Sequence, residues 1–303
     1  MFVQPVILCG GQGLRLWPYS NKPLIKLADA QSMLDKTILR VAKVSSYSPL
    51  LVCTQDFPLP TQYEHYSQLV EPYTNDTGVA IARIAHHYAD QKSVLLLILP
   101  ADNYITNEDV FVNDIKRAIN QYKDGITLFG IPPTYESSSY GYILPVEDKL
   151  LFREKPVPEQ AANYIKRGAY WNSGMLLVNN HVLYQSIPSD LTQVVVYPQA
   201  GKYPSFDVAV LQNYNNLTLF KSNHWGWSDV GSWKELISLL DNPNKDNVVI
   251  NECCDVQVHN VDNLQVVITD VKNLIVIIKD GKLLISNSKD DSSVKTAVSK
   301  IFK

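Results

Sequence analysis

The sequence lacks several features that would narrow its function at once. Its 303 residues include only four cysteines, and no two of them form a CxxC pair, so neither a disulfide framework nor a zinc site is expected. No apolar run approaches the roughly 18 residues of a membrane span. The N-terminus carries no basic segment followed by an apolar one, so no signal peptide is predicted. These absences favour a protein of the reducing cytoplasm with no membrane partner.

The sequence also lacks a large excess of charge of either sign. Lysine and arginine number 27 against 30 acidic residues, for a net charge of −3, so the composition offers no basic patch and nucleic acid is not expected as a partner. The six histidines are scattered, and no pair has the spacing of a metal site. Apolar residues make up 46% of the chain, which is enough for a sizeable core.

Short apolar runs alternate with helix-period segments over most of the chain. The runs at 5–9, 49–54, 93–102 and 125–131 read as strands, and those at 32–44 and 77–91 as helices. Thr77 is a plausible N-cap for the second helix. The continuous apolar run "SVLLLILPAD" is typical of a central parallel strand covered on both faces. The alternation predicts an α/β fold, with a doubly wound, Rossmann-like, mainly parallel sheet.

The pattern changes after about residue 245. Short Val- and Ile-rich runs follow one another, separated by Asp, Asn, Lys and Gly, and "IIKDGKLLI" carries the Asp-Gly pair of a tight hairpin. A short helix is expected at "SSVKTAVSKIF". We therefore predict two domains: 1–245, a larger α/β domain, and 246–303, a small β-rich appendage.

The loop "GGQGLRLWP" at 10–18 contains three of the chain's glycines. It is not a dinucleotide fingerprint, because Leu16 stands where the third glycine is required, and it lacks the GK pair of a Walker loop. Its bare backbone can still approach phosphate oxygens, and Arg15 adds a permanent charge that bridges them. From the glycines alone, a tight turn with a surface arginine is an equally good interpretation.

Read whole, this loop resembles the GGxGxRLxP signature of nucleoside-diphosphate-sugar pyrophosphorylases, and its Trp-Pro ending is typical of their mannose-1-phosphate guanylyltransferase branch. The resemblance continues in order through "EPYTNDT", "LPADN", "FGIPPTYESSSYGYI", "FREKP", "YWNSGMLLV", "SFDVAVL" and "GWSDVGSWKEL". It implies an enzyme, a nucleotidyltransferase that moves GMP from GTP to mannose 1-phosphate and releases pyrophosphate. It also implies a β-helix-like appendage and a homodimer.

On the phosphate side, the resemblance implies roles for Gly10, Gly11, Gly13, Arg15 and Lys22. The stretch after "LWP" is shorter than is typical, so Lys26 rivals Lys22. Asp102 ends the long apolar strand, where ligands of open α/β sheets bind, and Asp229 matches the family's second carboxylate. Together they are expected to hold Mg²⁺, which prefers oxygen ligands. Alternatively, Asp102 is a loop residue that caps the next turn, and "SDVGSW" is a helix entry capped by Ser228 or Ser232.

On the sugar side, Gly141, Glu154, Lys155, Asn172 and Gly174 match the family's pocket. Lys155 is expected to hold the sugar phosphate, Glu154 to accept from hydroxyls, Asn172 to donate and accept, and the glycines to make room. Without the neighbouring blocks, a solvated Glu-Lys pair at a strand end is the better interpretation.

Two residues are assigned to the nucleotide. Glu71 can accept both donors that guanine presents, N1–H and the 2-amino group, and Thr77 follows it in the same block. Asn75 and Asp76 stand where the family has Arg-Asn, and Asn103 stands where His is common. Two alternatives therefore stay open: transfer to a different hexose or heptose 1-phosphate, or a non-catalytic homologue that binds a nucleotide sugar. No His-rich pattern occurs, so a fused isomerase activity is not predicted.

Overall fold

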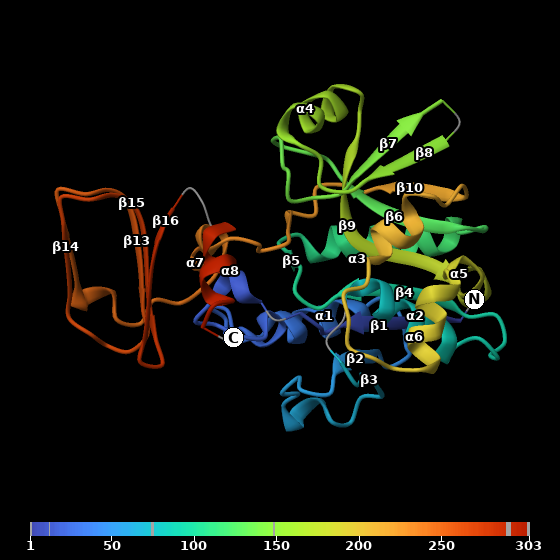
Figure 1. Cartoon of the computed structure of the whole chain (residues 1–303), viewed down its shortest axis with the longest axis horizontal. Helices are drawn as coiled ribbons and strands as arrows, with labels where there is room; N and C mark the ends of the chain where they lie inside the picture. The colour runs from blue at the N-terminus through green and yellow to red at the C-terminus, as the bar shows by residue number, and fades with distance from the viewer. Residues whose placement is uncertain (1, 12, 74–75, 148, 289–291, 302–303) are drawn as a thin grey trace. The chain divides into compact units, whose positions relative to one another are not determined.

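The computed structural model describes residues 2–11, 13–73, 76–147, 149–288 and 292–301. They form two compact units, each built from separate stretches of the chain (Figure 1). Unit 1 comprises Met1–Gly10, Thr37–Ala101 and Ile105–Trp227, and unit 2 comprises Gly11–Lys36, Asp102–Tyr104 and Ser228–Lys303. No helix in the described part of the chain is both long and apolar enough to cross a membrane.

Unit 1 is built around one large sheet. Its strands are β1 (Val3–Leu8), β2 (Leu50–Thr54), β3 (Gln68–Glu71), β4 (Leu95–Pro100), β6 (Ile126–Ile131), β7 (Tyr142–Val146), β8 (Lys149–Arg153), β9 (Tyr170–Asn179) and β10 (Leu217–Lys221). Its helices are α2 (Thr77–His87), α3 (Glu108–Gln121), α4 (Pro158–Lys166), α5 (Asn180–Ser186), α6 (Ser189–Val196), the 3-10 turn η3 (Thr61–Tyr63) and the π-helix η4 (Asp207–Leu211). Three elements have residues in both units: α1 (Met33–Ala42), β5 (Tyr104–Ile105) and β11 (Trp227–Ser228).

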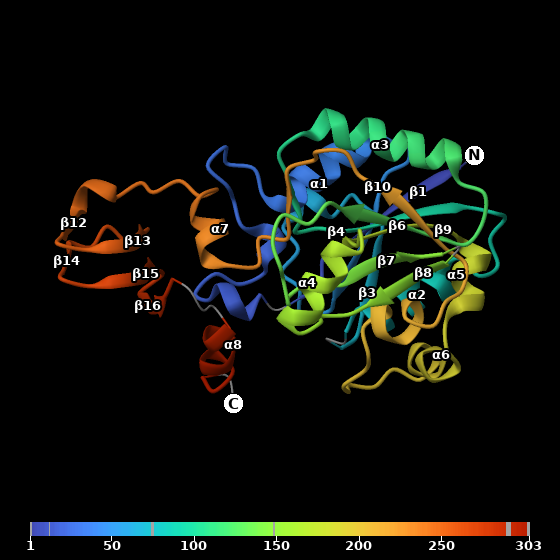
Figure 2. The ribbon, with the colours of Figure 1, turned by 90° about the horizontal axis from the view of Figure 1, so that it is seen from above.

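The strand order is β10-β6-β9-β4-β1-β2-β3, with β7 and β8 branching from β9. Four neighbouring pairs along this path are parallel, and β9 runs antiparallel to both β4 and β6. The predicted mainly parallel α/β fold is thus confirmed. Figure 2 shows α1 and α3 on one face of the sheet and α2 and α6 on the other. The strand β4 is buried along nearly its whole length because helices cover both faces.

Unit 2 contains η1 (Leu14–Leu16), η2 (Lys22–Leu24), α7 (Trp233–Ile237), η5 (Lys245–Asn247), β12 (Val248–Asn251), β13 (Cys254–Asn260), β14 (Val266–Thr269), β15 (Lys272–Lys279), β16 (Lys282–Asn287) and α8 (Ser292–Val298). Its C-terminal strands form the expected β appendage. The strand β12 pairs in parallel with β14, and β13 with β15, which is how successive coils of a β-helix pair. The predicted hairpin joins β15 to β16, and both turn residues, Asp280 and Gly281, have positive φ, as a type I′ turn requires.

The glycine-rich loop packs with this C-terminal segment. Leu16 and Ile25 from the loop share one buried cluster with Trp233 of α7 and with Ile275 and Ile277 of β15. The helix α8 also contacts η1. The sequence divides the chain once, near residue 245, whereas the loop's apolar side chains find their partners beyond that point. As a result, unit 2 combines an N-terminal loop with the C-terminal strands.

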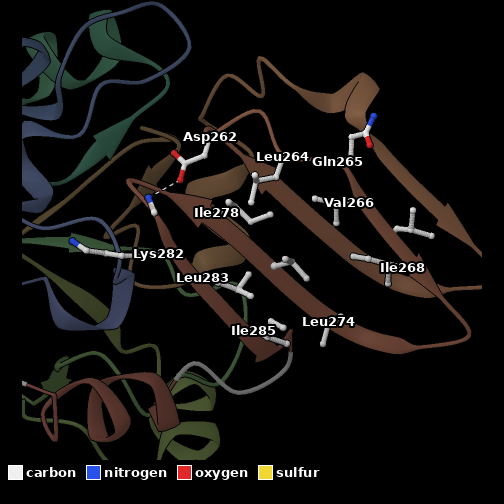
Figure 3. Close-up of a pocket in the computed structure, with 13 residues that line it drawn as sticks. Asp262, Leu264, Gln265, Val266, Ile268, Leu274, Ile278, Lys282, Leu283 and Ile285 are labelled. Carbon is white, nitrogen blue, oxygen red and sulfur yellow. Dashed lines mark hydrogen bonds between the residues drawn. The ribbon is translucent and has the colours of Figure 1, made fainter.

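Unit 2 also has an exposed apolar groove of about 430 Å³. Figure 3 shows side chains of β14, β15 and β16 lining it, among them Val266, Leu274 and Ile285. Near one end, Asp262 accepts a hydrogen bond from the Gly281 N–H at 2.7 Å. On the edge strand β16, Ile285 is 59% exposed. The appendage therefore buries its apolar surface only in part within unit 2.

Candidate active site

The loop that follows β1 presents its backbone without side chains. Gly11 and Gly13 have φ of 114° and 59°, conformations that glycine adopts without strain. A Cβ added to Gly10 or Gly11 would meet no atom within 4 Å, so the space beside this backbone is open. Arg15 is exposed on η1 while the next residue, Leu16, is buried. Gln12, within the same loop, lies outside the described residues.

Three of the predicted residues come together within unit 2 although they are far apart in sequence. The ammonium of Lys22 lies 2.9 Å from a carboxylate oxygen of Asp102 and also donates to the backbone carbonyl of Asp229. The Lys22 side chain is 12% exposed and that of Asp102 is 29% exposed, so the ion pair is largely removed from water. Lys26, the rival lysine, is exposed. The geometry places Lys22, and not Lys26, with the two aspartates.

Asp229 precedes a strained turn. Val230, which is fully buried, has a φ of 46°, a conformation that β-branched residues rarely adopt and that is often found at functional sites. The turn ends in α7, whose N-cap is Ser232 with Glu235 completing a capping box. Ser228 accepts from the Val230 N–H instead, at 2.9 Å. The helix entry expected as an alternative therefore exists, with Asp229 placed directly before it.

The oxygen atoms that surround the Lys22 ammonium are of the kinds that bind a divalent cation. The Asp102 carboxylate and the Asp229 carbonyl both contact one positive charge, so this point already stabilises a cation. Carboxylate and carbonyl oxygens are the ligands that Mg²⁺ prefers. No group of three or more His, Cys, Asp or Glu side chains that could hold a metal occurs in the part of the chain that the structure describes.

A second group of predicted residues comes together within unit 1, where β7, β8 and β9 meet. Asn172 donates its backbone N–H to the carbonyl of Gly141 at 2.8 Å. A Cβ on Gly141 would lie 2.5 Å from the ring of the fully buried Phe152 and 2.8 Å from a carboxylate oxygen of Glu154, so glycine lets both side chains approach this backbone closely. The Gly174 N–H donates to the Asn172 side-chain oxygen at 3.3 Å. Gly141, Glu154, Asn172 and Gly174 thus lie together in one polar cluster, and their role as a sugar pocket stays a prediction.

Lys155 extends from this cluster. Its ammonium is 2.6 Å from a Glu154 carboxylate oxygen, and its side chain is 55% exposed while that of Glu154 is 16% exposed. The backbone of Lys155 has a φ of 41°, which is uncommon for a residue with a side chain and costs of order 1–3 kcal/mol. An exposed pair at a strand end would also show this contact, so the role of Lys155 toward a sugar phosphate stays a prediction.

One member of the cluster was assigned no role from the sequence. Asp207, at the start of η4, accepts a hydrogen bond from the Asn172 side-chain amide at 2.9 Å. Burial raises the pKa of the Asp207 carboxyl to about 6, and the nearby Glu154 carboxylate adds to the effect. The only feature in the sequence that points to Asp207 is that it is a single carboxylate within the apolar run "SFDVAVL". That pattern does not predict its hydrogen-bond partner.

Glu71, one of the two residues assigned to the nucleotide, is buried, and one of its carboxylate oxygens is unpaired within the described part of the chain. Glu71 ends the parallel strand β3 and is 4% exposed, and its Oε2 atom has no hydrogen-bond partner among the described residues. Burial raises the pKa of Glu71 to about 7, although the charge of Arg83 acts in the opposite direction. An unsatisfied buried carboxylate oxygen is costly, and a donor from a ligand would satisfy it.

The expectation that Thr77 caps α2 is wrong. The N-cap is Asp76, whose carboxylate accepts from the Thr77 N–H at 2.7 Å, and Thr77 is the first helical residue. A carboxylate at this position accepts from the free N–H groups and also interacts favourably with the helix dipole. The Thr77 hydroxyl instead accepts from the Phe206 N–H at 3.2 Å. Asn75, in the same block, lies outside the described residues.

Comparisons with known proteins show which family the chain belongs to. The chain is 32% identical to a mannose-1-phosphate guanylyltransferase of Salmonella montevideo, over 86% of this chain and 64% of that protein. It is 33% identical to the mannose-1-phosphate guanylyltransferase RfbM of Salmonella typhimurium, over 80% and 59%. It therefore spans somewhat less than two thirds of the length of these curated relatives.

Solved structures show the same fold. A crystal structure titled mannose-1-phosphate geranyltransferase, from Thermus thermophilus, has a TM-score of 0.79 at 22% identity and covers all of both chains. HddC from Yersinia pseudotuberculosis, complexed with GMP-PN, has a TM-score of 0.52 at 16% identity, over 79% of this chain and 98% of that one. Finally, the family model described as nucleotidyl transferase matches residues 4–245. This chain belongs to the nucleotidyl transferase family.

Proposed function

We propose that this protein transfers GMP from GTP to mannose 1-phosphate, forming GDP-mannose and releasing pyrophosphate. A phosphate oxygen of the sugar 1-phosphate attacks the α-phosphorus of GTP. The new P–O bond forms as the bond to the bridging oxygen of the β-phosphate breaks, and pyrophosphate leaves with that electron pair. The observation that carries the proposal is that the Asp102 carboxylate and the Asp229 carbonyl both contact the ammonium of Lys22.

This chemistry places modest demands on acid–base groups. The attacking phosphate oxygen is already anionic near neutral pH, so no general base is needed. The protein must instead hold two polyanions and stabilise the charge on the transferring phosphoryl group. Arg15, exposed beside the bare glycine backbone, and Lys22 supply positive charge for the nucleotide phosphates. Lys155, with its exposed ammonium, supplies it for the sugar phosphate.

The proposed transfer also involves a Mg²⁺ ion. Asp102 and Asp229 would hold the ion, and phosphate oxygens and water would complete its coordination, as is usual for Mg²⁺ in phosphoryl-transfer sites. When bound, the ion neutralises negative charge on the phosphates. Lys22 already compensates the charge of Asp102 and holds that carboxylate in one orientation.

Two further groups support the choice of substrates. The unsatisfied Oε2 of Glu71 is suited to accept the donors of guanine. The Glu154 carboxylate and the Asn172 amide offer hydrogen-bonding groups of both kinds beside Gly141. Sugar hydroxyls both donate and accept, so this cluster suits a pyranose ring.

The test is a matrix of nucleoside triphosphates against sugar 1-phosphates, scored by pyrophosphate release in the presence of Mg²⁺. We expect GTP with mannose 1-phosphate to give the highest kcat/KM. A different hexose or heptose 1-phosphate, or a different nucleotide, as the best pair would refute the substrate assignment. No turnover with any pair would indicate a protein that binds nucleotide sugars without converting them.

A further inference from the structure

A carboxylate without an assigned role lies within the sugar-side cluster. Asp207 is the first residue of the π-helix η4, and the preceding residue, Phe206, is 2% exposed and anchors the turn in the core of unit 1. Single π-turns are rare and frequently occur at functional sites. The position of Asp207 is therefore fixed by packing, and its side chain is held where the Asn172 amide can reach it.

The hydrogen bond between them determines how Asn172 is oriented. The amide of asparagine has a donor end and an acceptor end of nearly the same shape, so packing alone does not distinguish the two orientations. A carboxylate only accepts. Because the Asp207 oxygen lies 2.9 Å from the Asn172 nitrogen, the donor end must face it. The Asn172 oxygen then faces the Gly174 N–H, 3.3 Å away.

The charges around Asp207 make this arrangement sensitive to its ionisation. Burial has the largest effect on the pKa of Asp207, the carboxylates of Glu154 and Asp76 raise it further, and the ammonium of Lys155 lowers it, so that the pKa is about 6. Above that pH the ionised group accepts a charge-assisted hydrogen bond, which is about twice as strong as a neutral one. Below it, the protonated group adds a donor of its own and no longer enforces one orientation of Asn172.

We propose that Asp207 is a positioning residue for the sugar 1-phosphate: by accepting from Asn172 it fixes the donor and acceptor pattern that this amide presents to the pyranose hydroxyls, and its ionised form is the working form. This inference rests on the proposed function, because it names a determinant of the same sugar subsite. Asp207 acts through Asn172 and takes no part in bond making.

The test compares three variants by steady-state kinetics, with mannose 1-phosphate varied at saturating GTP and then the reverse. Asp207→Ala removes the acceptor, and we expect KM for mannose 1-phosphate to rise on the order of 10-fold or more. Asp207→Asn keeps the shape but can present a donor or an acceptor, so a smaller rise, roughly 3- to 10-fold, is expected. Asp190→Asn, which changes an exposed carboxylate of the same unit, should match the unmodified protein. KM for GTP should stay within about 2-fold throughout.

The pH profile separates positioning from a merely structural role. In the unmodified protein, kcat/KM for mannose 1-phosphate should fall as the pH drops through about 6. In Asp207→Asn this contribution should vanish, leaving the titration of the substrate phosphate and of Glu71, whose pKa burial raises to about 7. An Asp207→Asn variant with an unaltered KM and an unaltered acidic limb would overturn the proposal, whatever the stability of Asp207→Ala.

A binding measurement keeps this inference distinct from the proposed function. If the unmodified protein releases no pyrophosphate with any substrate pair, the proposed function fails. Calorimetric titration with mannose 1-phosphate then decides the present inference by itself. Weaker binding by Asp207→Asn than by Asp190→Asn supports it, and equal binding, or no binding by any of the proteins, refutes it.

Discussion

Replacing Lys22 with methionine removes the charge that links Asp102 to Asp229 while keeping most of the side-chain volume. At 2.9 Å and an effective dielectric constant of about 20, the gross attraction between the Lys22 ammonium and the Asp102 carboxylate is about 6 kcal/mol. Desolvation offsets most of this, and Asp102 keeps partial access to water, so the expected loss of folding free energy is only about 1–2 kcal/mol. Urea denaturation measures it.

The loss of activity should be much larger than the loss of stability. A positive charge aimed at a transferring phosphoryl group is comparable to an oxyanion donor, whose removal lowers kcat by roughly 10²–10³-fold. The matched control is Lys26→Met, because Lys26 is exposed and should change stability by no more than about 0.5 kcal/mol. Pyrophosphate release at saturating GTP and mannose 1-phosphate measures both variants.

Two outcomes would contradict this reasoning. If Lys22→Met kept kcat within about 3-fold of the unmodified protein, the charge would have no role in transfer. If Lys26→Met lost activity and Lys22→Met did not, the lysine that contacts phosphate would be Lys26 and not Lys22.

Four further predictions concern other groups. Arg15→Ala should lower turnover by roughly two orders of magnitude with an unchanged Tm, because the side chain is exposed; near-normal turnover would remove Arg15 from the mechanism. Glu71→Gln should relax the kcat/KM preference for GTP over the other triphosphates, because the amide cannot accept both guanine donors; unchanged selectivity would refute its role. Chelation of Mg²⁺ should abolish pyrophosphate release, and added Mg²⁺ should restore it; full activity in chelator would argue against a metal. Burial lowers the pKa of His259 to about 4, below that of the unfolded chain, so stability should fall by up to about 3 kcal/mol as the pH drops from 6.5 toward 4. The variant His259→Gln should lose that dependence in urea titrations, and a persisting dependence would assign it to other groups.

Local patterns predicted the elements that depend on local physics. The run that became β4 is apolar at nearly every position because the strand is covered on both faces. The Asp-Gly pair formed the tight turn of the β15–β16 hairpin because both residues tolerate positive φ. The ordered blocks also placed Asp102 and Asp229 in one group, which no single block could do.

What the sequence did not show depends on contacts between distant segments. The partner of Asp207 is Asn172, in another strand, and no periodicity connects the two. The sequence predicts the N-cap of α2 one residue late, because Asp76 and Thr77 both suit an N-cap and the hydroxyl of Thr77 accepts a hydrogen bond from the distant Phe206. The packing of Leu16 with residues of β15 likewise joins the two ends of the chain.

The most direct measurement of the central claim follows phosphorus through the reaction. The protein is incubated with mannose 1-phosphate and GTP labelled either at the α- or at the γ-phosphorus, and the products are separated. We expect the α-label to appear in GDP-mannose and the γ-label in pyrophosphate, in equal amounts. Recovery of the α-label as GMP or GDP, or of the γ-label as inorganic phosphate without a labelled nucleotide sugar, would show hydrolysis in place of transfer and would contradict it.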